Sequence, residues 1–352
     1  MSKIIKPIIG SMVLCTTAIS VHAQSEVSLT GYTYGGIAFN SGGATAHTAM
    51  GAPASFMLKS TEDLGGGNRM LVKWESGFSL KDGAQENPSS FWDKQAYIGV
   101  QGNWGTVRGG RLYTPAFATL ALTVDPTETY GLFTSTNLVE LHDVRLPSGI
   151  IYNTPGFNPW TYASNGFYGT LAYYFGDGSG GASKNSSKDF NVGYAEPGKW
   201  EIEFSGHRKN TFVAGTNDTN KTSFILGGYY IIGPAKIYLG YSWARANNTL
   251  TNLNTTKNSD LILGGSYRIF GNQRITGSFI KHNDKTAANN DAWQIGLGYE
   301  YYFSKSTRIM IAFAKIHNKN PANPYKIVNG YSGTTAATGG TQTIAIGLVR
   351  NF

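Results

Sequence analysis

Three cations in the N-terminal third of the chain lie near apolar residues, in segments that have the pattern of extended strands. These cations are Lys59, Lys73 and Arg108. The nearby apolar residues are Phe56 and Leu58, Val72 and Trp74, and Val107. Successive side chains of a strand point to opposite faces, so each cation lies on the face opposite these residues. A channel wall with cations on its water-facing side selects ions, because low-dielectric walls focus the electric field of these charges in a narrow passage.

No other group of residues in the sequence indicates a more specific chemical function. The run 62–67, EDLGGG, resembles a phosphate-binding loop, but no Lys-Ser/Thr pair follows it, and we interpret it as a turn. Glu201 and Glu203 share a strand face without a positioned partner, so we interpret them as lining acids. The five histidines beyond residue 23 lack metal-ligand spacing, and no G-x-S-x-G elbow occurs. We therefore expect neither a metal nor a cofactor.

The composition disfavours a bundle of helices, whether soluble or membrane-spanning. Charged residues make up only 14% of the chain, against about 25% in average soluble proteins. The mean hydropathy of −0.22 is nevertheless too polar for a helical protein that crosses the membrane many times. Glycine (45 residues) and tyrosine (21 residues) are abundant, which favours extended structure with tight turns.

The first 23 residues have the features of a secretory signal. Lys3 and Lys6 precede an apolar run, and a small-residue cleavage site lies before Gln24. Cleavage would remove two of the 29 basic residues and no acid, leaving 27 against 21 and a net charge of +6. The only cysteine, Cys15, would be lost too, since the residues before it do not fit a lipidation site. The mature chain, 24–352, would be exported and free of disulfides.

The stretch 225–243 has the length of a transmembrane helix but the pattern of two strands. Gly233-Pro234 marks a turn at its middle, and the proline alone would cost a helix about 3 kcal/mol relative to alanine. After the turn, apolar and polar side chains alternate, as in a hairpin with one apolar side. Those expected to face lipid are Leu226, Tyr230, Ile237, Leu239, Tyr241 and Trp243, and those expected to face water are Tyr229, Lys236, Tyr238 and Ser242.

The same hairpin recurs along the C-terminal half, with a glycine and a tyrosine before each tight turn. The tyrosines Tyr194, Tyr230, Tyr267 and Tyr299 are 36, 37 and 32 residues apart. Long Asn- and Thr-rich connections separate the hairpins, so short turns alternate with long loops. Amphipathic strands of about ten residues with such connections are typical of a transmembrane β-barrel. A soluble β-sandwich would show less even spacing.

We predict an all-β fold with sixteen antiparallel strands, and eighteen as the alternative count. The first eight are expected near 26–39, 53–60, 68–79, 93–101, 106–112, 149–154, 160–175 and 188–195. The other eight are expected near 199–209, 221–232, 236–246, 258–269, 274–283, 291–302, 307–317 and 341–352. A closed barrel leaves no unpaired strand edge in lipid, and one of this size encloses an aqueous lumen.

Two motifs resemble those of the Gram-negative general porins. The segment ASFMLKSTEDLGGG at 54–67 resembles the family pattern S-R-F-G-L-K-G-x-E-D-L-G-G-G. The segment WDKQAYIGVQGNWGTVRGGRLYTP at 92–115 is similar to F-N-R-Q-A-Y-V-G-L-x-G-x-F-G-T-V-x-x-G-R-x-Y-T-P. The chain ends in TIAIGLVRNF, and its terminal Phe352 resembles the signal that the family presents to the barrel-assembly machinery.

The resemblance implies a 16-stranded antiparallel transmembrane β-barrel in the outer membrane of a Gram-negative bacterium, usually as a homotrimer. It implies a non-enzymatic, water-filled channel through which small hydrophilic solutes and ions diffuse. In the family, the third external loop folds inward and narrows the lumen. The connection 113–148 occupies that place in this chain, and its length is typical of a functional loop.

The family places basic residues of the barrel wall opposite acidic residues of the inward loop. Lys94 matches the Arg of F-N-R-Q-A-Y, Arg111 matches the Arg of G-R-x-Y-T-P, and Arg145 fits the Arg before the sixth strand. Ser55 departs from the pattern, which has Arg there, and this would weaken a preference for anions. The predicted basic wall comprises Lys94, Arg111, Arg145, Arg108, Lys73 and Lys59, and the loop acids are Asp125, Glu128, Glu140 and Asp143.

The primary hypothesis is a general diffusion porin with a weak preference for anions, based on the basic wall and the net charge. A channel that prefers organic anions or short saccharides is the alternative, suggested by lumen aromatics such as Tyr238. An outer-membrane hydrolase would need a Ser/His/acid cluster, for which His207 and His282 are the candidates. Adhesion through the long loops could accompany conduction. Lipid contact is expected, and nucleic acid is not.

Overall fold

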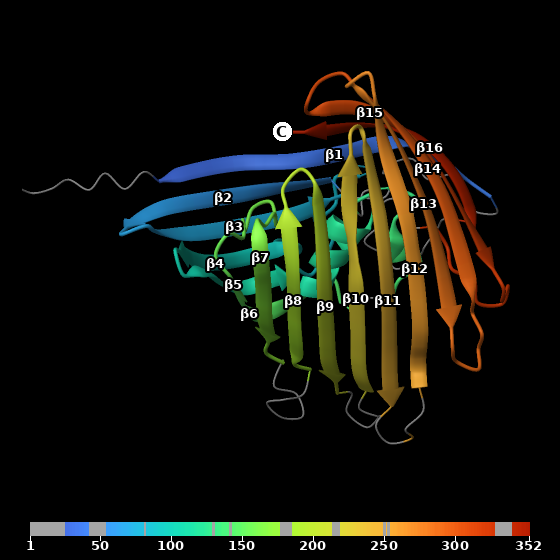
Figure 1. Ribbon diagram of the computed structural model, residues 1–352, viewed down its shortest axis with the longest axis horizontal. Helices are drawn as coiled ribbons and strands as arrows, with labels where there is room; N and C mark the ends of the chain where they lie inside the picture. The colour runs from blue at the N-terminus through green and yellow to red at the C-terminus, as the bar shows by residue number, and fades with distance from the viewer. Residues whose placement is uncertain are drawn as a thin grey trace, which may run out of the picture.

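Sixteen antiparallel strands close into a barrel in the computed structural model, which describes residues 25–41, 54–80, 82–128, 131–140, 143–176, 185–212, 219–248, 251, 254–327 and 340–352. Each strand pairs with its neighbours in sequence, and β1 pairs with β16 (Figure 1). The predicted fold class and strand count are confirmed. The predicted signal at 1–23, its cleavage site before Gln24, and His47 and His142 lie outside the described residues.

The strands match the predicted ranges closely, because alternation and turn residues are local signals. They are β1 (Glu26–Asn40), β2 (Ala54–Gly65), β3 (Asn68–Phe78), β4 (Gln95–Gly102), β5 (Gly105–Tyr113), β6 (Arg145–Asn153), β7 (Gly166–Tyr174), β8 (Ser187–Glu196), β9 (Trp200–Thr211), β10 (Thr219–Ile232), β11 (Ala235–Asn248), β12 (Asn254–Ile269), β13 (Gln273–Asp284), β14 (Ala292–Tyr302), β15 (Thr307–Asn318) and β16 (Gln342–Asn351). Short helical turns interrupt the β5–β6 connection: α1 (Pro115–Ala118), the π-helical η1 (Thr119–Val124) and the 3-10 η2 (Ser135–Asn137). In the described part of the chain, no helix has the length and apolarity needed to cross a membrane.

The hairpin of β10 and β11 shows how the barrel separates its two faces. Leu239 is 57% exposed on the outer face, whereas its neighbour Tyr238 is 3% exposed on the inner face. Gly233 takes a left-handed φ of 56° in the turn, a conformation that glycine adopts without strain. The other predicted lipid-facing residues of this hairpin are also exposed, which confirms the predicted parity: Leu226, Tyr230, Ile237, Tyr241 and Trp243.

The barrel closes where the last strand meets the first. Gly31 N–H donates to the Phe352 carbonyl at 2.8 Å, and Phe352 N–H donates to the Gly31 carbonyl at 2.9 Å. The Phe352 ring packs so closely over Gly31 that a Cβ there would lie 2.5 Å from the ring. The C-terminus therefore lies beside β1 (Figure 1), and the side chain of Phe352 stays half exposed on the outer side.

The β6–β7 hairpin differs most from the predicted ranges. β6 starts at Arg145, four residues before the expected start, and β7 starts at Gly166, six residues after the expected start at 160. The intervening connection 154–165 contains two prolines, which cannot donate to a strand ladder. It folds into its own turn, in which Tyr162 N–H donates to the Asn158 carbonyl at 2.7 Å.

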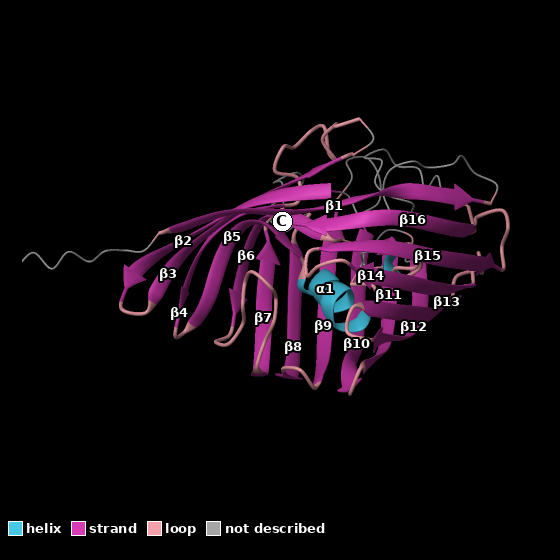
Figure 2. Ribbon diagram, turned by 90° about the horizontal axis from the view of Figure 1, so that it is seen from above, coloured by secondary structure: helices cyan, strands magenta, loops and turns pink. Residues whose placement is uncertain are grey.

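The β5–β6 connection packs against the inward faces of β9–β14. Figure 2 shows α1 within the ring of strands. Val124 lies over Gly240, where a Cβ would come within 2.1 Å of its Cγ1, and Phe133 lies over Gly296, where a Cβ would come within 2.0 Å of its Cβ. Leu120, Leu132 and Phe133 join inward-facing residues such as Ile262 in one apolar cluster. The connection therefore occupies part of the space inside the barrel.

Candidate functional site

The β5–β6 connection is folded around one buried carboxylate, Asp125. Asp125 Oδ1 accepts hydrogen bonds from Thr127 N–H at 2.8 Å and Thr127 Oγ1 at 2.7 Å. Its Oδ2 accepts from Thr134 Oγ1 at 2.8 Å and Ser135 N–H at 2.7 Å. Burial raises the pKa of Asp125, although these hydrogen bonds oppose the shift. Asp125 was predicted as a lumen acid, but it is fully buried and shapes the connection.

Buried polar contacts fix the connection to the far wall. Asn137 Nδ2 donates to Gln294 Oε1 at 2.7 Å, and Gln294 Nε2 donates to the Phe133 carbonyl at 2.8 Å. Thr123 Oγ1 donates to Glu203 Oε2 at 2.8 Å. Glu203 faces inward, as its strand parity predicts, but it is buried beneath the connection. These contacts link three parts of the connection to β9 and β14.

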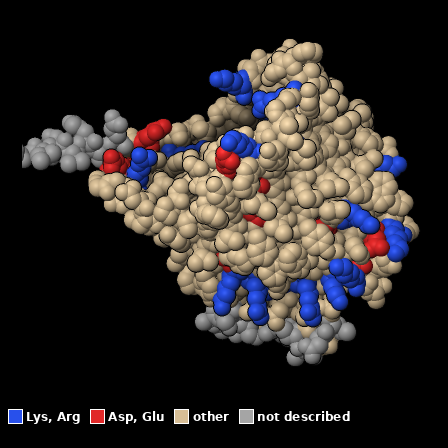
Figure 3. Space-filling model, in the orientation of Figure 1, with Lys and Arg blue, Asp and Glu red and all other residues tan. Residues whose placement is uncertain are grey.

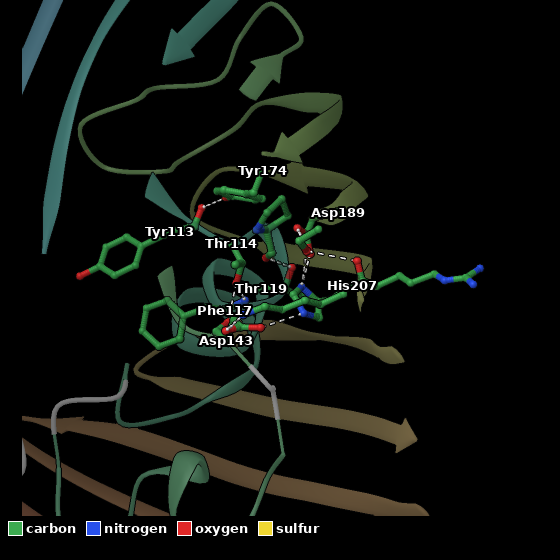
Figure 4. A network of polar contacts seen from close by, with 12 residues as sticks. Tyr113, Thr114, Phe117, Thr119, Asp143, Tyr174, Asp189 and His207 are labelled. Carbon is green, nitrogen blue, oxygen red and sulfur yellow. Dashed lines mark hydrogen bonds and ion pairs between the residues drawn. The ribbon is translucent and has the colours of Figure 1, made fainter. Parts of the chain in front are cut away.

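The two ends of the connection meet beside β8 and β9 (Figure 4). Thr114 Oγ1 donates to the Asp143 carbonyl at 2.9 Å. The Asp143 carboxylate accepts from Lys209 Nζ at 2.8 Å and lies 3.3 Å from His207 Nε2, while His207 Nδ1 pairs with Asp189. Burial alone would raise the pKa of Asp143, but the bonds with His207 and Lys209 outweigh it and lower the pKa below its ordinary value. Predicted as a lumen acid, Asp143 instead joins the connection to the wall.

Acid should weaken this attachment. A carboxylate whose pKa is lowered in the folded chain stabilises it above the unfolded pKa, and this stabilisation is lost as the pH falls through the folded value. We expect single-channel current noise to rise as the pH falls from about 7 to about 3, below the ordinary pKa of Asp. Asp143→Asn should already be noisy at neutral pH, and equal noise in both proteins throughout would contradict the assignment.

On the opposite wall, Lys94 and Arg145 share one buried acid, Glu86. Lys94 Nζ lies 3.3 Å from Glu86 Oε2 and donates to the Tyr32 hydroxyl at 2.9 Å. Arg145 Nη1 lies 3.9 Å from Glu86 Oε1, with its guanidinium 5.3 Å from the Tyr113 ring centroid. The Glu86 side chain is 3% exposed, whereas that of Arg145 is 19% exposed. The arginine therefore presents the charge of this cluster to water.

The other members of the predicted basic wall differ in exposure. Lys73 is buried and pairs with Glu75 at 2.9 Å. Arg111 is partly exposed and donates through Nε to the Asp93 carbonyl at 2.6 Å. Lys59 is also partly exposed, with its Nζ 5.9 Å from the Trp160 ring centroid. Lys59 and Arg111 are therefore more accessible than Lys73.

Arg108 faces inward but is enclosed by aromatic rings. Its guanidinium lies 5.2 Å from the ring centroid of Tyr97, 5.4 Å from that of Phe157 and 5.5 Å from that of Tyr162. Its Nη2 donates to Asn153 Oδ1 at 3.0 Å, and the side chain is 2% exposed. The connection 154–165, which supplies two of the rings, separates Arg108 from the lumen. Its inward orientation agrees with the outward exposure of its neighbour Val107, and its guanidinium is covered by the three rings.

The remaining predicted acids lie apart. Glu128 is partly exposed and lines a cavity of about 40 Å³ with Arg274, Glu300 and Arg308. Glu140 is exposed. Within the described residues, Lys73, Lys94 and Arg145 of the predicted basic wall form ion pairs with the wall acid Glu75 and with Glu86, neither of which belongs to the β5–β6 connection. The structure thus does not bring the predicted acids and bases together into a single set of ion pairs.

A second cationic cluster on β13–β15 was missed by the sequence analysis. Arg274 pairs through Nε with Glu300, and Arg308 Nε lies 2.6 Å from the other Glu300 oxygen. The Glu300 side chain is 6% exposed, against 25% for Arg274 and 12% for Arg308. The signal was present in the parity of these strands, because Ile275 and Ile311 face outward and even-numbered residues therefore face inward.

The two histidine clusters lack the geometry of a hydrolase. In a catalytic triad the histidine contacts the acid through one nitrogen and the serine through the other. Ser187 Oγ and Asp189 both lie at Nδ1 of His207, and Asp143 lies at Nε2. His282 contacts Asp260 through Nδ1 and the Tyr325 hydroxyl through Nε2. Among the described residues, no group of three or more His, Cys, Asp or Glu could hold a metal ion.

The lumen aromatic suggested for solute preference is covered. Lys236 Nζ lies 4.6 Å from the Tyr238 ring centroid and 3.6 Å from that of Tyr229, as cation–π contacts require. Tyr238 is only 3% exposed. Its ring therefore offers a passing solute little surface.

Comparison with known proteins gives one family and a set of similar folds. The family model described as Gram-negative porin matches residues 10–321. The anion-selective porin from Comamonas acidovorans is 23% identical, with 94% of this chain and 100% of that chain covered and a TM-score of 0.78. The trimer form of in-vitro folded OmpT of Vibrio cholerae is 16% identical (93% and 99% covered, TM-score 0.68). Salmonella typhi OmpF in complex with daunomycin is 14% identical (93% and 97% covered, TM-score 0.61). No curated protein matches the sequence.

Proposed function

The chain belongs to the Gram-negative porin family, and we propose that its barrel prefers anions because of two cationic clusters on the inner wall. The protein is an outer-membrane diffusion channel for ions and small hydrophilic solutes. Its described strands carry apolar residues outside and polar or charged residues inside, as a water-filled barrel in lipid requires.

One arrangement carries the proposal: in each cluster, one buried acid serves two cations. Glu86 lies between Lys94 and Arg145, and Glu300 lies between Arg274 and Arg308. The Glu86 cluster thus has one positive charge in excess, whereas Glu128, which lines the cavity beside Arg274 and Arg308, offsets that of the Glu300 cluster; the most exposed cation of each cluster is an arginine. Low-dielectric walls focus such a field into the lumen, where it raises the local concentration of anions. The anion-selective porin from Comamonas acidovorans, which is 23% identical, is consistent with this proposal.

A bilayer recording with unequal KCl baths tests the sign of the selectivity. We expect the reversal potential to show a higher permeability for Cl⁻ than for K⁺, most clearly at low salt, because salt screens lumen charges. A reversal potential of the opposite sign would overturn the anion preference and leave the diffusion channel intact. Solute-dependent block of the current would instead support the alternative, a channel that prefers organic anions or saccharides.

We propose that residues 113–148 narrow the channel and that Lys59, Arg111 and Arg145 line the narrow part. The contacts of Val124 and Phe133 with the inward faces of β11 and β14 support this role. Lys94 and Lys73 would act through their buried acids rather than by touching ions. Exclusion of polymers of graded size measures the radius of the pore. A pore radius that stays unchanged in a variant whose β5–β6 connection is displaced from the wall would refute the narrowing.

We further propose a homotrimer, as in the trimer form of OmpT. Native mass spectrometry of the purified protein should give a complex of three chains. Three full-length chains of 38.0 kDa have a mass of about 114 kDa, and removal of the signal would lower this mass. A monomer at every concentration would contradict the trimer.

Removal of residues 1–23 stays a prediction, checked by N-terminal sequencing that should begin at Gln24. Recognition of Phe352 by the assembly machinery is checked by the outer-membrane level of a chain lacking it. Purified protein should not hydrolyse ester lipids.

A further inference from the structure

Four cations form a belt across the outer face of the barrel, near the ends of five consecutive strands. Lys188 of β8 pairs in register with Arg208 of β9, which pairs with Thr222 of β10. Thr222 pairs with Arg245 of β11, which pairs with Lys257 of β12. We call Lys188, Arg208, Arg245 and Lys257 the cationic belt. Like charges directly opposite each other destabilise a sheet, so the belt calls for a compensating partner.

The cationic belt lies on the lipid-facing side of the strands. Lys188 has the parity of the exposed Val192, Arg208 that of Ile202, and Arg245 that of Trp243. All four cations are exposed, and none forms an ion pair with an acid of the described residues. Figure 3 shows Lys and Arg side chains gathered along the lower edge of this face, where β8–β12 end.

The cationic belt lies at the end of the strands that carries the long connections. Lys188 is the second residue of β8, after the connection 175–186, and Arg208 is three residues before the end of β9. In outer-membrane barrels, long connections face the exterior and short turns face the periplasm. The belt therefore lies at the depth of the outer-leaflet headgroups, where charged residues meet lipid.

An apolar groove begins directly beneath Lys188 and Arg208. It has a volume of about 740 Å³, and its walls include Ile150, Leu171, Phe190 and Phe224, with the two cations at its rim. Gly206 forms part of its lining between Phe190 and Phe224, its partners in register, whose rings pack over it. Leu171 and Ile150 are 66% and 49% exposed. This arrangement fits a lipid whose anionic headgroup contacts the cations and whose acyl chain lies in the apolar groove.

We propose that Lys188 and Arg208 bind a phosphate group of an acidic glycolipid of the outer leaflet, with one of its acyl chains in the groove. The guanidinium of Arg208 can donate two parallel hydrogen bonds to phosphate oxygens, and the ammonium of Lys188 adds a point charge. Arg245 and Lys257 extend the positive surface to a second phosphate. A second copy of this protein would have to place acidic residues against the cationic belt. A phosphorylated lipid supplies both a negative charge for the cations and an acyl chain for the groove.

The test compares lipid binding by two double variants of the full chain in detergent. Lys188→Gln/Arg208→Gln removes two charges at the groove. Lys281→Gln/Lys315→Gln removes two exposed, outward-facing lysines from β13 and β15. These strands are at least four strands from β9, about 19 Å at 4.8 Å per strand, and Lys281 pairs with Leu261 of β12, four residues or about 14 Å along the strand from Lys257 of the belt. Both separations exceed the Debye length of about 8 Å at physiological salt. The probes are lipid A, its deacylated sugar phosphate, phosphatidylcholine and inorganic phosphate, measured by native mass spectrometry and fluorescence competition.

We expect the groove variant to bind lipid A about 25-fold more weakly, at about fivefold per charge, and the control variant to bind it as the parent does. Deacylated sugar phosphate should bind more weakly than lipid A, and phosphatidylcholine should be insensitive to either variant. Conductance should be unchanged in both, because these side chains point away from the lumen. Equal loss in the control variant, unchanged binding in the groove variant, or competition by inorganic phosphate as strong as by lipid A would overturn the proposal. So would a changed oligomeric state with lipid binding intact, which would make the belt an interface between chains.

Discussion

Replacing Gly240 with alanine should loosen the β5–β6 connection from the barrel wall and raise both the unitary conductance and its noise. The new Cβ would lie 2.1 Å from Val124 Cγ1, which is far inside van der Waals contact. Val124 is fully buried and β-branched, so its side chain cannot turn aside. Overpacking of this kind costs about 1–3 kcal/mol in unfolding free energy. We expect the chain to relieve it by moving the connection, because the alternative is to distort the barrel ladder. Single-channel recording and thermal unfolding measure the two consequences.

A second substitution makes this prediction specific. In Val124→Ala/Gly240→Ala the offending Cγ1 is gone, and the next heavy atoms, Val124 Cβ and Ile262 Cδ1, lie 3.5 Å from the new Cβ. The double variant should therefore be quieter than Gly240→Ala alone, with a coupling energy of about 0.5–3 kcal/mol. Gly277→Ala is the matched control, because its nearest atom would be the Gly296 carbonyl oxygen at 3.7 Å. If Gly277→Ala and Gly240→Ala behave alike, the connection is not held at this point.

The barrel could be predicted from the sequence because its signals are local. Alternation along β10 and β11 and the turn at Gly233-Pro234 need only neighbouring residues, and the predicted faces of Leu239 and Tyr238 are those observed. β7 was predicted six residues too early, since Trp160 and Tyr162 alternate with small or polar residues, as in a strand, after the two prolines of the connection 154–165. Its fold depends on contacts that sequence does not show, such as Tyr162 OH donating to Gln95 Oε1 at 2.7 Å.

The site could be predicted only in part, because its contacts join residues that are far apart in the sequence. Parity placed Lys73 and Arg108 on the inner face correctly, but it says nothing of what covers them. The rings around Arg108 come from Tyr97 of β4 and from Phe157 and Tyr162 of the connection 154–165, more than forty residues away in sequence. The contact of Asn137 with Gln294 joins residues 157 apart in sequence. The path of the connection, and with it the buried roles of Asp125 and Asp143, follows from such long-range contacts.

Neutralising Lys59 and Arg145 together should largely remove the preference for anions. Both side chains are partly exposed on the inner face, whereas the acids beneath them, Glu75 and Glu86, are buried. A unit charge 4 Å from an ion in water contributes about 1 kcal/mol, which corresponds to about fivefold in local concentration. We expect Lys59→Gln/Arg145→Gln to lower the Cl⁻ over K⁺ permeability ratio by about fivefold for each charge removed, up to about 25-fold at low salt. Reversal potentials across a KCl gradient measure the change.

The sign of the change in the permeability ratio shows whether Arg145 acts within the lumen or only through the net charge of the protein. Lys281→Gln removes a lysine of the outer face, and it should leave the permeability ratio unchanged because lipid and protein lie between this residue and the ion path. Glu86→Gln removes the buried acid between Lys94 and Arg145, so it should shift the ratio toward anions, opposite to Arg145→Gln. Since Glu86 stabilises a buried lysine, this variant should also unfold more easily, and its selectivity is read only from channels of normal conductance. Shifts of equal sign in the two variants would place both residues outside the narrow part of the lumen. Opposite signs require that ions pass close enough to Arg145 to feel its charge and that of the acid behind it.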